Sequence, residues 1–443
     1  FDEHTICVNL HTGSSAGPRR AAGPMMKKAA APVVAQRAEF ASFKEAYVLA
    51  LVCGVACEYA QAAHLYLLCR RADLGGADVA RVYACGLAAA AAATLLAKTA
   101  EKCLGLKPAC LSCFLLYGVS AFLCGSAATV HSFRSLCAAR VLAGAASGLL
   151  LSSFDSWMRR AHALANHGMP ALMQTYASLA RATTAASIAT GALCDAGRHF
   201  RQSDVFAYDA ALALAAVGGA VVSRSFASVD APHDAARDAP QCGGAGALAA
   251  MPHAARATTL AAIAFEVVAK LLTAAWAPLA WRCAVHVNAS APIGAVFSAL
   301  MAAAVVGAKG FEAASRARWS IETVACVACG VAAAAMGCLR LGFAGAGATA
   351  TLVPLLIFQG CVGCAMPAFG TLRGRHVPAA ARAAAAHVAT AVSGIAAVAL
   401  LPLYAQRPGK FFAANASLCA AAAVAMATLL RRAPPVVPGV PQV

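Results

Sequence analysis

The sequence predicts an all-α membrane protein of about twelve transmembrane helices, arranged as two halves of six. The 443 residues are 61% hydrophobic and only 12% charged, and their mean hydropathy is +0.70. Soluble domains carry about twice that share of charge. Twelve spans of ~20 residues with short loops would use nearly the whole chain. The composition therefore leaves no room for a separate soluble catalytic domain, and we expect no enzyme.

Each expected span is an apolar stretch bounded by glycine, proline or charged residues. Alanine runs such as Ala88 to Ala93 are only weakly apolar, but small residues let membrane helices approach closely. The expected spans are 45–69, 77–97, 109–130, 134–158, 170–194, 205–223, 258–280, 290–309, 319–340, 347–369, 380–403 and 411–430.

The longest polar stretch, from Ser225 to Arg256, lies between the sixth and seventh spans and is interpreted as a linker. We therefore expect a disordered basic tail at 1–44, a six-helix bundle at 45–224, a cytosolic linker at 225–257, a second bundle at 258–430 and a tail at 431–443. The first tail contains no apolar core with a cleavage site, so no signal peptide is predicted; a targeting presequence is the alternative.

The distribution of basic residues predicts the orientation in the membrane. With both termini in the cytosol, the cytosolic segments hold 22 Lys and Arg and the opposite loops hold 10. This bias follows the positive-inside rule. The glycosylation sequon at Asn288 then lies on the non-cytosolic side. The net charge of +17 is thus a topology signal, and we expect no nucleic-acid partner.

The 19 cysteines lie mostly inside apolar spans, where a free thiol behaves as a small hydrophobic group. Cys361 and Cys364 have C-x-x-C spacing, but they fall within an expected helix. We expect neither a metal nor a cofactor, and we expect a monomer in the lipid bilayer.

A charge in the middle of a bilayer is costly, so each ionisable residue in a span is expected to have a charged or polar partner or a functional role. Glu58 and Gln61 lie on one face of the first span. They are either a proton-coupling or substrate-binding cluster, or a carboxyl satisfied by neighbouring helices. Arg140 begins a face that continues through Gly144 and Gly148, where another helix can approach closely. Arg140 binds an anion or pairs with a carboxylate.

The fifth span carries the face on which we place substrate. Gln174, Ser178 and Arg181 are spaced at i, i+4 and i+7, so they share one helix face. A guanidinium with amide and hydroxyl donors suits a tetrahedral oxyanion.

Two further sets of charges have both a structural and a functional interpretation. Glu266 and Lys270 are an i, i+4 pair in the seventh span. They neutralise each other, or Lys270 contacts substrate while Glu266 tunes it. Asp155 ends the fourth span before two arginines, and Glu101 and Lys102 follow the second span. We assign these three residues to gating.

Several segments, in order along the chain, resemble a known family. The stretch Glu101 to Lys107 is similar to the acid-basic-x-Gly-x-basic loop of the major facilitator superfamily, with one extra residue. The stretch Arg140 to Trp157 resembles the corresponding segment of that superfamily's molybdate-anion transporter family. Further matches are Glu58 to Gln61 with Tyr66, Gln174 to Tyr176, Tyr208 to Ala211, Phe265-Glu266, Trp276 to Pro278, Ala291 to Gly294, Met366-Pro367, Leu372-Arg373 and Val377-Pro378.

This resemblance implies the twelve-helix major facilitator fold and uptake of molybdate across a membrane, the plasma membrane first and an organelle membrane second. It implies family polar positions at Glu58, Gln61, Arg140, Asp155, Gln174, Thr175, Asp209 and Glu266. The resemblance implies a basic residue at the position of Ser178, and here the basic residue lies three positions later, at Arg181, on the same face. Anion binding is retained if Arg181 substitutes for that residue; if it does not, the substrate differs. Lys270 has no matched position.

The sequence leaves other functions open. A coupled proton is one possible second partner. Another small anion or metabolite is the alternative substrate, because a fold does not fix a substrate. A membrane receptor or scaffold without transport activity is a third possibility.

Overall fold

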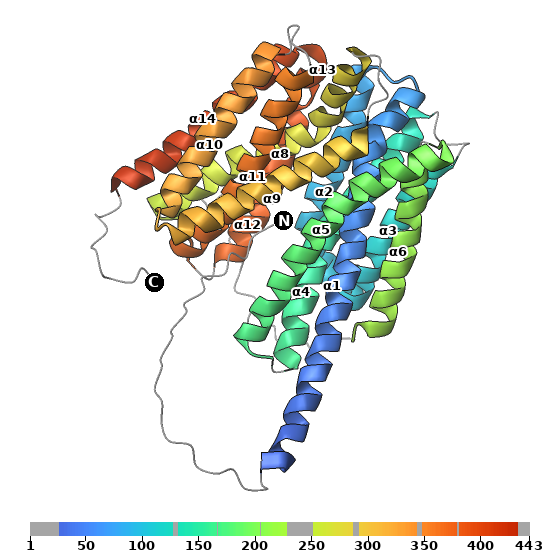
Figure 1. Cartoon of the computed structure of the whole chain (residues 1–443), viewed down its shortest axis with the longest axis vertical. Helices are drawn as coiled ribbons and strands as arrows, with labels where there is room; N and C mark the ends of the chain where they lie inside the picture. The colour runs from blue at the N-terminus through green and yellow to red at the C-terminus, as the bar shows by residue number, and fades with distance from the viewer. Residues whose placement is uncertain are drawn as a thin grey trace.

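The computed structural model is entirely helical over the residues that it describes, which are 26–126, 132–165, 167–203, 205–227, 251–286, 292–342, 348–378 and 381–432. Twelve long helices and one short helix follow one another in this part of the chain (Figure 1). They are α1 (Met26–Arg71), α2 (Gly76–Leu104), α3 (Leu106–Gly125), α4 (Phe133–Leu164), α5 (Met169–Arg201), α6 (Phe206–Ser225), α8 (His253–His286), α9 (Ile293–Arg316), α10 (Ile321–Gly342), α11 (Ala348–His376), α12 (Arg382–Leu400), α13 (Pro402–Gln406) and α14 (Pro408–Arg432).

The twelve long helices correspond to the twelve expected spans, and eleven of them are long and apolar enough to cross a membrane. The exception is α5, which carries Gln174, Arg181 and a series of threonines and serines. Polar residues in a membrane helix must face the protein interior or water rather than lipid. The polar residues of α5 are therefore expected to face the neighbouring helices rather than lipid.

Two helix boundaries differ from the expectation. The segment 26–44, which we expected to belong to a disordered tail, is helical, because α1 begins at Met26. Alanine, lysine, glutamine and glutamate are strong helix formers, and they dominate this segment. The eleventh span is divided at Pro402, where proline ends α12 and begins α13. Most of the expected linker at 225–257 lies outside the described residues.

The two halves, α1–α6 and α8–α14, repeat one packing scheme. In the first half α2 packs on α4, α3 on α4, α1 on α6, α3 on α6 and α1 on α5. The same pairings recur in the second half as α9 on α11, α10 on α11, α8 on α14, α10 on α14 and α8 on α12. The chain therefore contains an internal repeat of six long helices.

The halves meet mainly through α5 with α9 and α2 with α12, a pair of contacts that the repeat relates to each other (Figure 1). The α5–α9 contact involves the last third of α5, because Gly191 lies against Gly294 at the beginning of α9. The ring of Tyr66 near the end of α1 lies 6.3 Å from that of Trp281 in α8. We call this end of the molecule, where α5 ends and α9 begins, the joined end.

Close helix packing at glycine is confirmed where the sequence predicts it. A Cβ atom on Gly144 would lie 2.1 Å from the carbonyl oxygen of Gly86. One on Gly148 would lie 2.8 Å from the carbonyl oxygen of Ala90. Helices α2 and α4 thus approach to a separation that only glycine permits at these positions.

Candidate substrate site

The polar face of α5 is turned toward the second half. Ile188 and Asp195 follow Arg181 at intervals of seven residues, or about two helix turns. Both contact α9: Ser298 donates its hydroxyl to the Ile188 carbonyl at 2.6 Å, and the Ala295 amide donates to Asp195 at 2.8 Å. Since these residues share one face, Arg181 points toward the other half, below the joined end.

The same face carries the other two residues that we predict for substrate. Gln174 and Arg181 have exposed side chains, and Ser178 is half-buried. Arg181 lies near the middle of the expected span 170–194, and among the described residues no carboxylate pairs with it. Exposure of this arginine to lipid would be costly, which favours a position for its side chain at the interface between the halves.

A second cation approaches the interface from the other half. Lys270 precedes Trp281 by eleven residues, or about three turns, so the two share a face of α8. Trp281 contacts Tyr66 and Arg70 of α1 across the interface. The Lys270 side chain is 27% exposed, although it lies at the centre of its helix. Arg181 and Lys270 therefore lie at mid-helix positions on helix faces that contact the other half nearer the joined end.

Lys270 belongs to a cluster that joins three helices of the second half. Its ammonium donates to Ser393 Oγ and to the Thr390 carbonyl, at 3.0 Å, and lies 3.6 Å from Glu266 Oε2. Arg373 of α11 lies 3.7 Å from the other oxygen of Glu266. Glu266 and Arg373 are both buried, whereas Lys270 is not. The Glu266 carboxylate therefore pairs with both Lys270 and Arg373. Lys270 is the more exposed of the two cations, so it is the one that can contact a substrate.

Glu58 and Gln61 are bonded inside the first half. The Tyr117 hydroxyl of α3 donates to Glu58, and Ser120 Oγ donates to Gln61 Oε1 at 2.7 Å. The Tyr208 hydroxyl of α6 donates to the Gln61 carbonyl at 3.2 Å. Gln61 is buried, so the structure places it in the packing of α1 against α3 and α6 rather than on the interface. Glu58 is half-buried, beside Tyr59, which contacts Phe297 of α9.

Arg140 also lies within the first half. Its Nε and Nη2 atoms lie 3.2 Å from the Cβ position of Gly86, where any side chain would displace them. Tyr83 and Tyr208 are close to its guanidinium. Among the described residues no carboxylate pairs with Arg140, so the carboxylate partner that the sequence suggested is not found there.

The three predicted gating residues lie at the opposite end from the joined end. Asp155 accepts a hydrogen bond from the Tyr176 hydroxyl at 2.5 Å and forms an ion pair with Arg159 at 2.7 Å. Glu101 lies next to Ser153 and Ser156 of α4, and Lys102 is exposed. These contacts join α2, α4 and α5 within one half, where they fix the geometry of that end.

Sequence reasoning missed four residues that the structure brings to these sites: Tyr117, Arg373, His64 and Asp195. Tyr117 donates to the half-buried Glu58, and Arg373 lies beside the buried Glu266; these partners are 59 and 107 positions away in the sequence. His64 and Asp195 meet at the joined end. Helical spacing identifies residues that share a face, but it carries no information about which distant helix that face meets.

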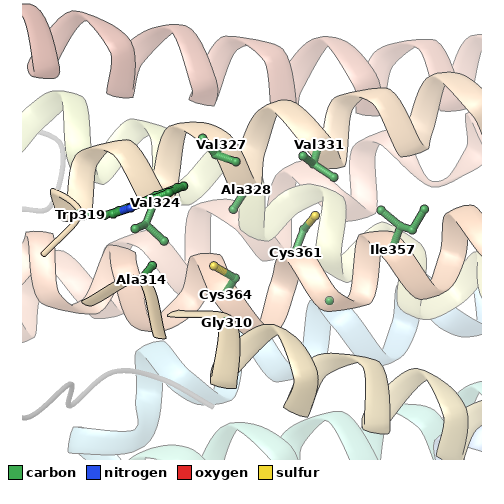
Figure 2. A pocket seen from close by; sticks show the side chains of 11 residues that line it. Gly310, Ala314, Trp319, Val324, Val327, Ala328, Val331, Ile357, Cys361 and Cys364 are labelled. Atoms are coloured by element: carbon green, nitrogen blue, oxygen red, sulfur yellow. The ribbon is translucent and has the colours of Figure 1, made fainter. Parts of the chain in front are cut away.

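An apolar pocket of about 310 Å³ lies elsewhere, within the second half (Figure 2). It is formed by α9, α10 and α11, and Trp319, Val327, Ile357, Cys361 and Cys364 are among its lining residues. No charged side chain lines it. The pocket is therefore unsuited to an anion, and we place the substrate site between the halves instead.

Comparison with known proteins agrees with this architecture. Residues 18–342 match a family model described as sugar transporters with twelve transmembrane segments. A molybdate-anion transporter from Xenopus tropicalis is 26% identical over 333 residues, which cover 73% of this chain and 70% of the relative.

Solved transporters share the fold at low sequence identity. A D-xylose–proton symporter has a TM-score of 0.67 at 12% identity and covers 87% of this chain and 96% of its own. A nucleoside transporter has a TM-score of 0.64 at 14% identity, with 88% and 99% covered. A peptide transporter in complex with sulfate has a TM-score of 0.67 at 11% identity, with 88% and 94% covered. The repeated halves, the membrane-spanning helices and the family match over most of the sequence together show that the chain belongs to this twelve-helix family of the major facilitator superfamily and is a multi-pass membrane transporter, not an enzyme.

Proposed function

We propose that this transporter moves molybdate, a tetrahedral oxyanion, by alternating access around a site between α5 and α8. The observation that carries the proposal is the placement of Arg181 and Lys270, one cation from each half, on faces turned toward the other half at mid-helix depth. Guanidinium and ammonium groups are the side chains that bind oxyanions most strongly. Gln174 and Ser178 add neutral donors beside Arg181.

The curated relative supports the choice of molybdate, because its name states that it transports the molybdate anion. With both termini in the cytosol, as the basic residues predict, the joined end is non-cytosolic. In the proposed cycle, the end opposite the joined end is cytosolic, and the two halves expose the site to each side in turn. The plasma membrane is the proposed location, and the protein acts as a monomer.

Transport of a neutral sugar is the second candidate, because the matching family model is described as sugar transporters. A sugar site needs donors and acceptors arranged around hydroxyl groups. A neutral sugar does not require cations, whereas Arg181 has no carboxylate partner among the described residues and Lys270 shares Glu266 with Arg373. The charge at the interface therefore favours an anion over a sugar.

Uptake into proteoliposomes tests the proposal. We expect saturable uptake of molybdate, competition by sulfate above phosphate, and no uptake of xylose. Arg181→Ala removes a charge-assisted hydrogen bond of about 1.5–3 kcal/mol, which corresponds to a rise in KM of about 10- to 100-fold. Arg316→Ala, at an exposed arginine paired with Glu312 at the end of α9, is the matched control and should behave as wild type.

Two results would reject the proposal. Uptake of xylose without molybdate would favour the sugar alternative, and it would leave the fold and the alternating-access geometry unchanged. Molybdate uptake that Arg181→Ala leaves unaltered would show that the anion does not bind on this face of α5.

A further inference from the structure

A histidine and a carboxylate meet in the buried packing of the joined end. His64 of α1 is 1% exposed, and its Nε2 atom lies 3.7 Å from Oδ1 of Asp195 in α5. The Asp195 side chain is 15% exposed. Neither atom has a hydrogen-bond partner among the described residues. Neither residue belongs to the proposed substrate site.

Both ring nitrogens of His64 face oxygen atoms that can only accept hydrogen bonds, namely the Ala60 carbonyl and the Asp195 carboxylate. Nδ1 lies 3.2 Å from the carbonyl oxygen of Ala60, so Nδ1 must carry a proton and donate it. In a neutral imidazole the other nitrogen then has a lone pair, which would point at the Asp195 carboxylate. This arrangement is repulsive in a buried site. It becomes favourable when one additional proton lies between Nε2 and Oδ1.

The second carboxylate oxygen of Asp195 forms a hydrogen bond with the other half. Oδ2 accepts a hydrogen bond of 2.8 Å from the backbone amide of Ala295, the third residue of α9. A carboxylate is stabilised there, because the first amides of a helix are unsatisfied and the helix dipole is positive at that end. The ionised form of Asp195 is thus held by α9, and the additional proton resides on His64.

Few other titratable groups face this pair. Arg198 of α5 lies 3.8 Å from Oδ1, and Cys194 is the buried neighbour of Asp195 on the same helix. On α9 the residues from Ile293 to Ala308 include no titratable side chain. From α6, Tyr208 reaches Gln61, one turn before His64. Histidine is the side chain in this group that changes charge between pH 5 and 8.

The contact between Asp195 and α9 distinguishes this pair from the other bonded carboxylates. Glu58 accepts from Tyr117, and Asp155 from Tyr176, so both are satisfied within the first half. If the halves rock as rigid bodies, those bonds persist in every state. Separation at the joined end removes the Ala295 amide from Asp195 and admits water to His64. The surroundings of this pair therefore change with the conformation of the transporter.

We propose that His64 and Asp195 form a proton-binding site that holds the joined end closed. The site takes up one proton from the water on that side. Closure then buries the resulting imidazolium–carboxylate pair, and the Asp195 carboxylate accepts a hydrogen bond from the first turn of α9. Loss of the proton leaves a lone pair against a carboxylate and favours separation of the halves. Closure is accordingly favoured at low pH and weakened as the pH rises.

Amide hydrogen exchange on the full chain in lipid nanodiscs tests this site without any substrate. The readout is protection of the first turn of α9, Ile293 to Val296, between pH 5 and 8.5, corrected for the pH dependence of chemical exchange. We expect protection to fall with rising pH by up to about tenfold per pH unit, the limit for release of one proton. Protection of α10 reports that the protein remains folded.

Three variants separate the proposed proton site from general effects of pH. His64→Gln keeps a donor for Asp195 but cannot titrate, so protection of α9 should become independent of pH. Asp195→Asn should lower protection several-fold at every pH, because a neutral amide oxygen is a weaker acceptor for the α9 amide. His199→Gln replaces an exposed histidine at the same end of α5 and should leave the wild-type profile intact.

Either of two outcomes would overturn the proposal. In the first, protection of α9 in the wild type does not vary with pH while α10 stays protected. In the second, His64→Gln retains the wild-type pH dependence, which would place the titrating group elsewhere. Neither outcome depends on the transported substrate, so this experiment tests the proton site independently of the oxyanion proposal.

Discussion

At the scale of single residues, the polar side chains of the spans divide into two groups. Gln61 is buried and Arg140 is half-buried within one half, where they bond to neighbouring helices or pack against them. Arg181 and Lys270 lie on faces turned toward the opposite half. The sequence could identify both groups as intramembrane polar residues. It could not separate them, because the separation depends on which distant helix each face meets.

The bond between Tyr117 and Glu58 allows a direct test of the first group. Tyr117 is fully buried, and Tyr117→Phe removes the hydroxyl that donates to Glu58. An unsatisfied carboxylate in this position should lower the free energy of unfolding by about 1–3 kcal/mol. Thermal unfolding in detergent measures the effect.

A suitable control lies on the same helix. Ser112 is half-buried, and among the described residues its hydroxyl donates to the Pro108 carbonyl one turn earlier. Ser112→Ala should change the melting temperature little. If Tyr117→Phe melts at the wild-type temperature, the hydroxyl contributes nothing to stability and Glu58 has another partner.

At the scale of helices, hydropathy predicts eleven of the twelve spans, and α5 is the exception. Eleven long helices meet the apolar threshold, and α5 does not, because its faces carry glutamine, arginine, serine and threonine. Periodicity placed Gln174, Ser178 and Arg181 on one face. That this face meets α9 required the structure, since α5 and α9 are separated by about 100 residues of sequence. The helical start of α1 was missed because charged, alanine-rich segments suit both helices and tails.

Glycine contacts determine how closely α2 and α4 pack. Gly144→Ala would place a methyl group 2.1 Å from the Gly86 carbonyl, and the backbone cannot yield as a flexible side chain would. We expect a loss of about 1–3 kcal/mol in stability, measured by thermal unfolding. Gly330→Ala is the matched control, because nothing lies within 4 Å of its Cβ position. Alanine there should be neutral or stabilising, since it favours the helix by up to about 1 kcal/mol. Equal melting temperatures for the two variants would contradict the close approach.

At the scale of the whole molecule, two similar halves meet through α5 with α9 and α2 with α12. This symmetry allows the halves to rock about a site that both of them line. Hydrophobic pattern and a central polar stretch predicted two halves of six helices. The conformational state was beyond prediction, because one sequence must support every state of the cycle.

The orientation in the membrane can be tested by glycosylation. With the termini in the cytosol, Asn288 lies on the non-cytosolic side, and protein made in secretory membranes should carry a glycan that Asn288→Gln removes. Asn415 has the same sequon but is buried in α14, so Asn415→Gln should leave the glycan unchanged. An epitope at the N-terminus that antibodies reach from outside intact cells would contradict this orientation.

The central claim is that an oxyanion binds between the halves, and locating the anion tests it most directly. Molybdenum scatters X-rays anomalously, so a crystal of the molybdate complex reports the position of the metal atom independently of the protein. We predict one anomalous peak between α5 and α8, within reach of both Arg181 and Lys270. A peak in the apolar pocket of α9–α11, inside the first half beside Arg140, or at none of these places in a crystal of transport-competent protein would contradict it.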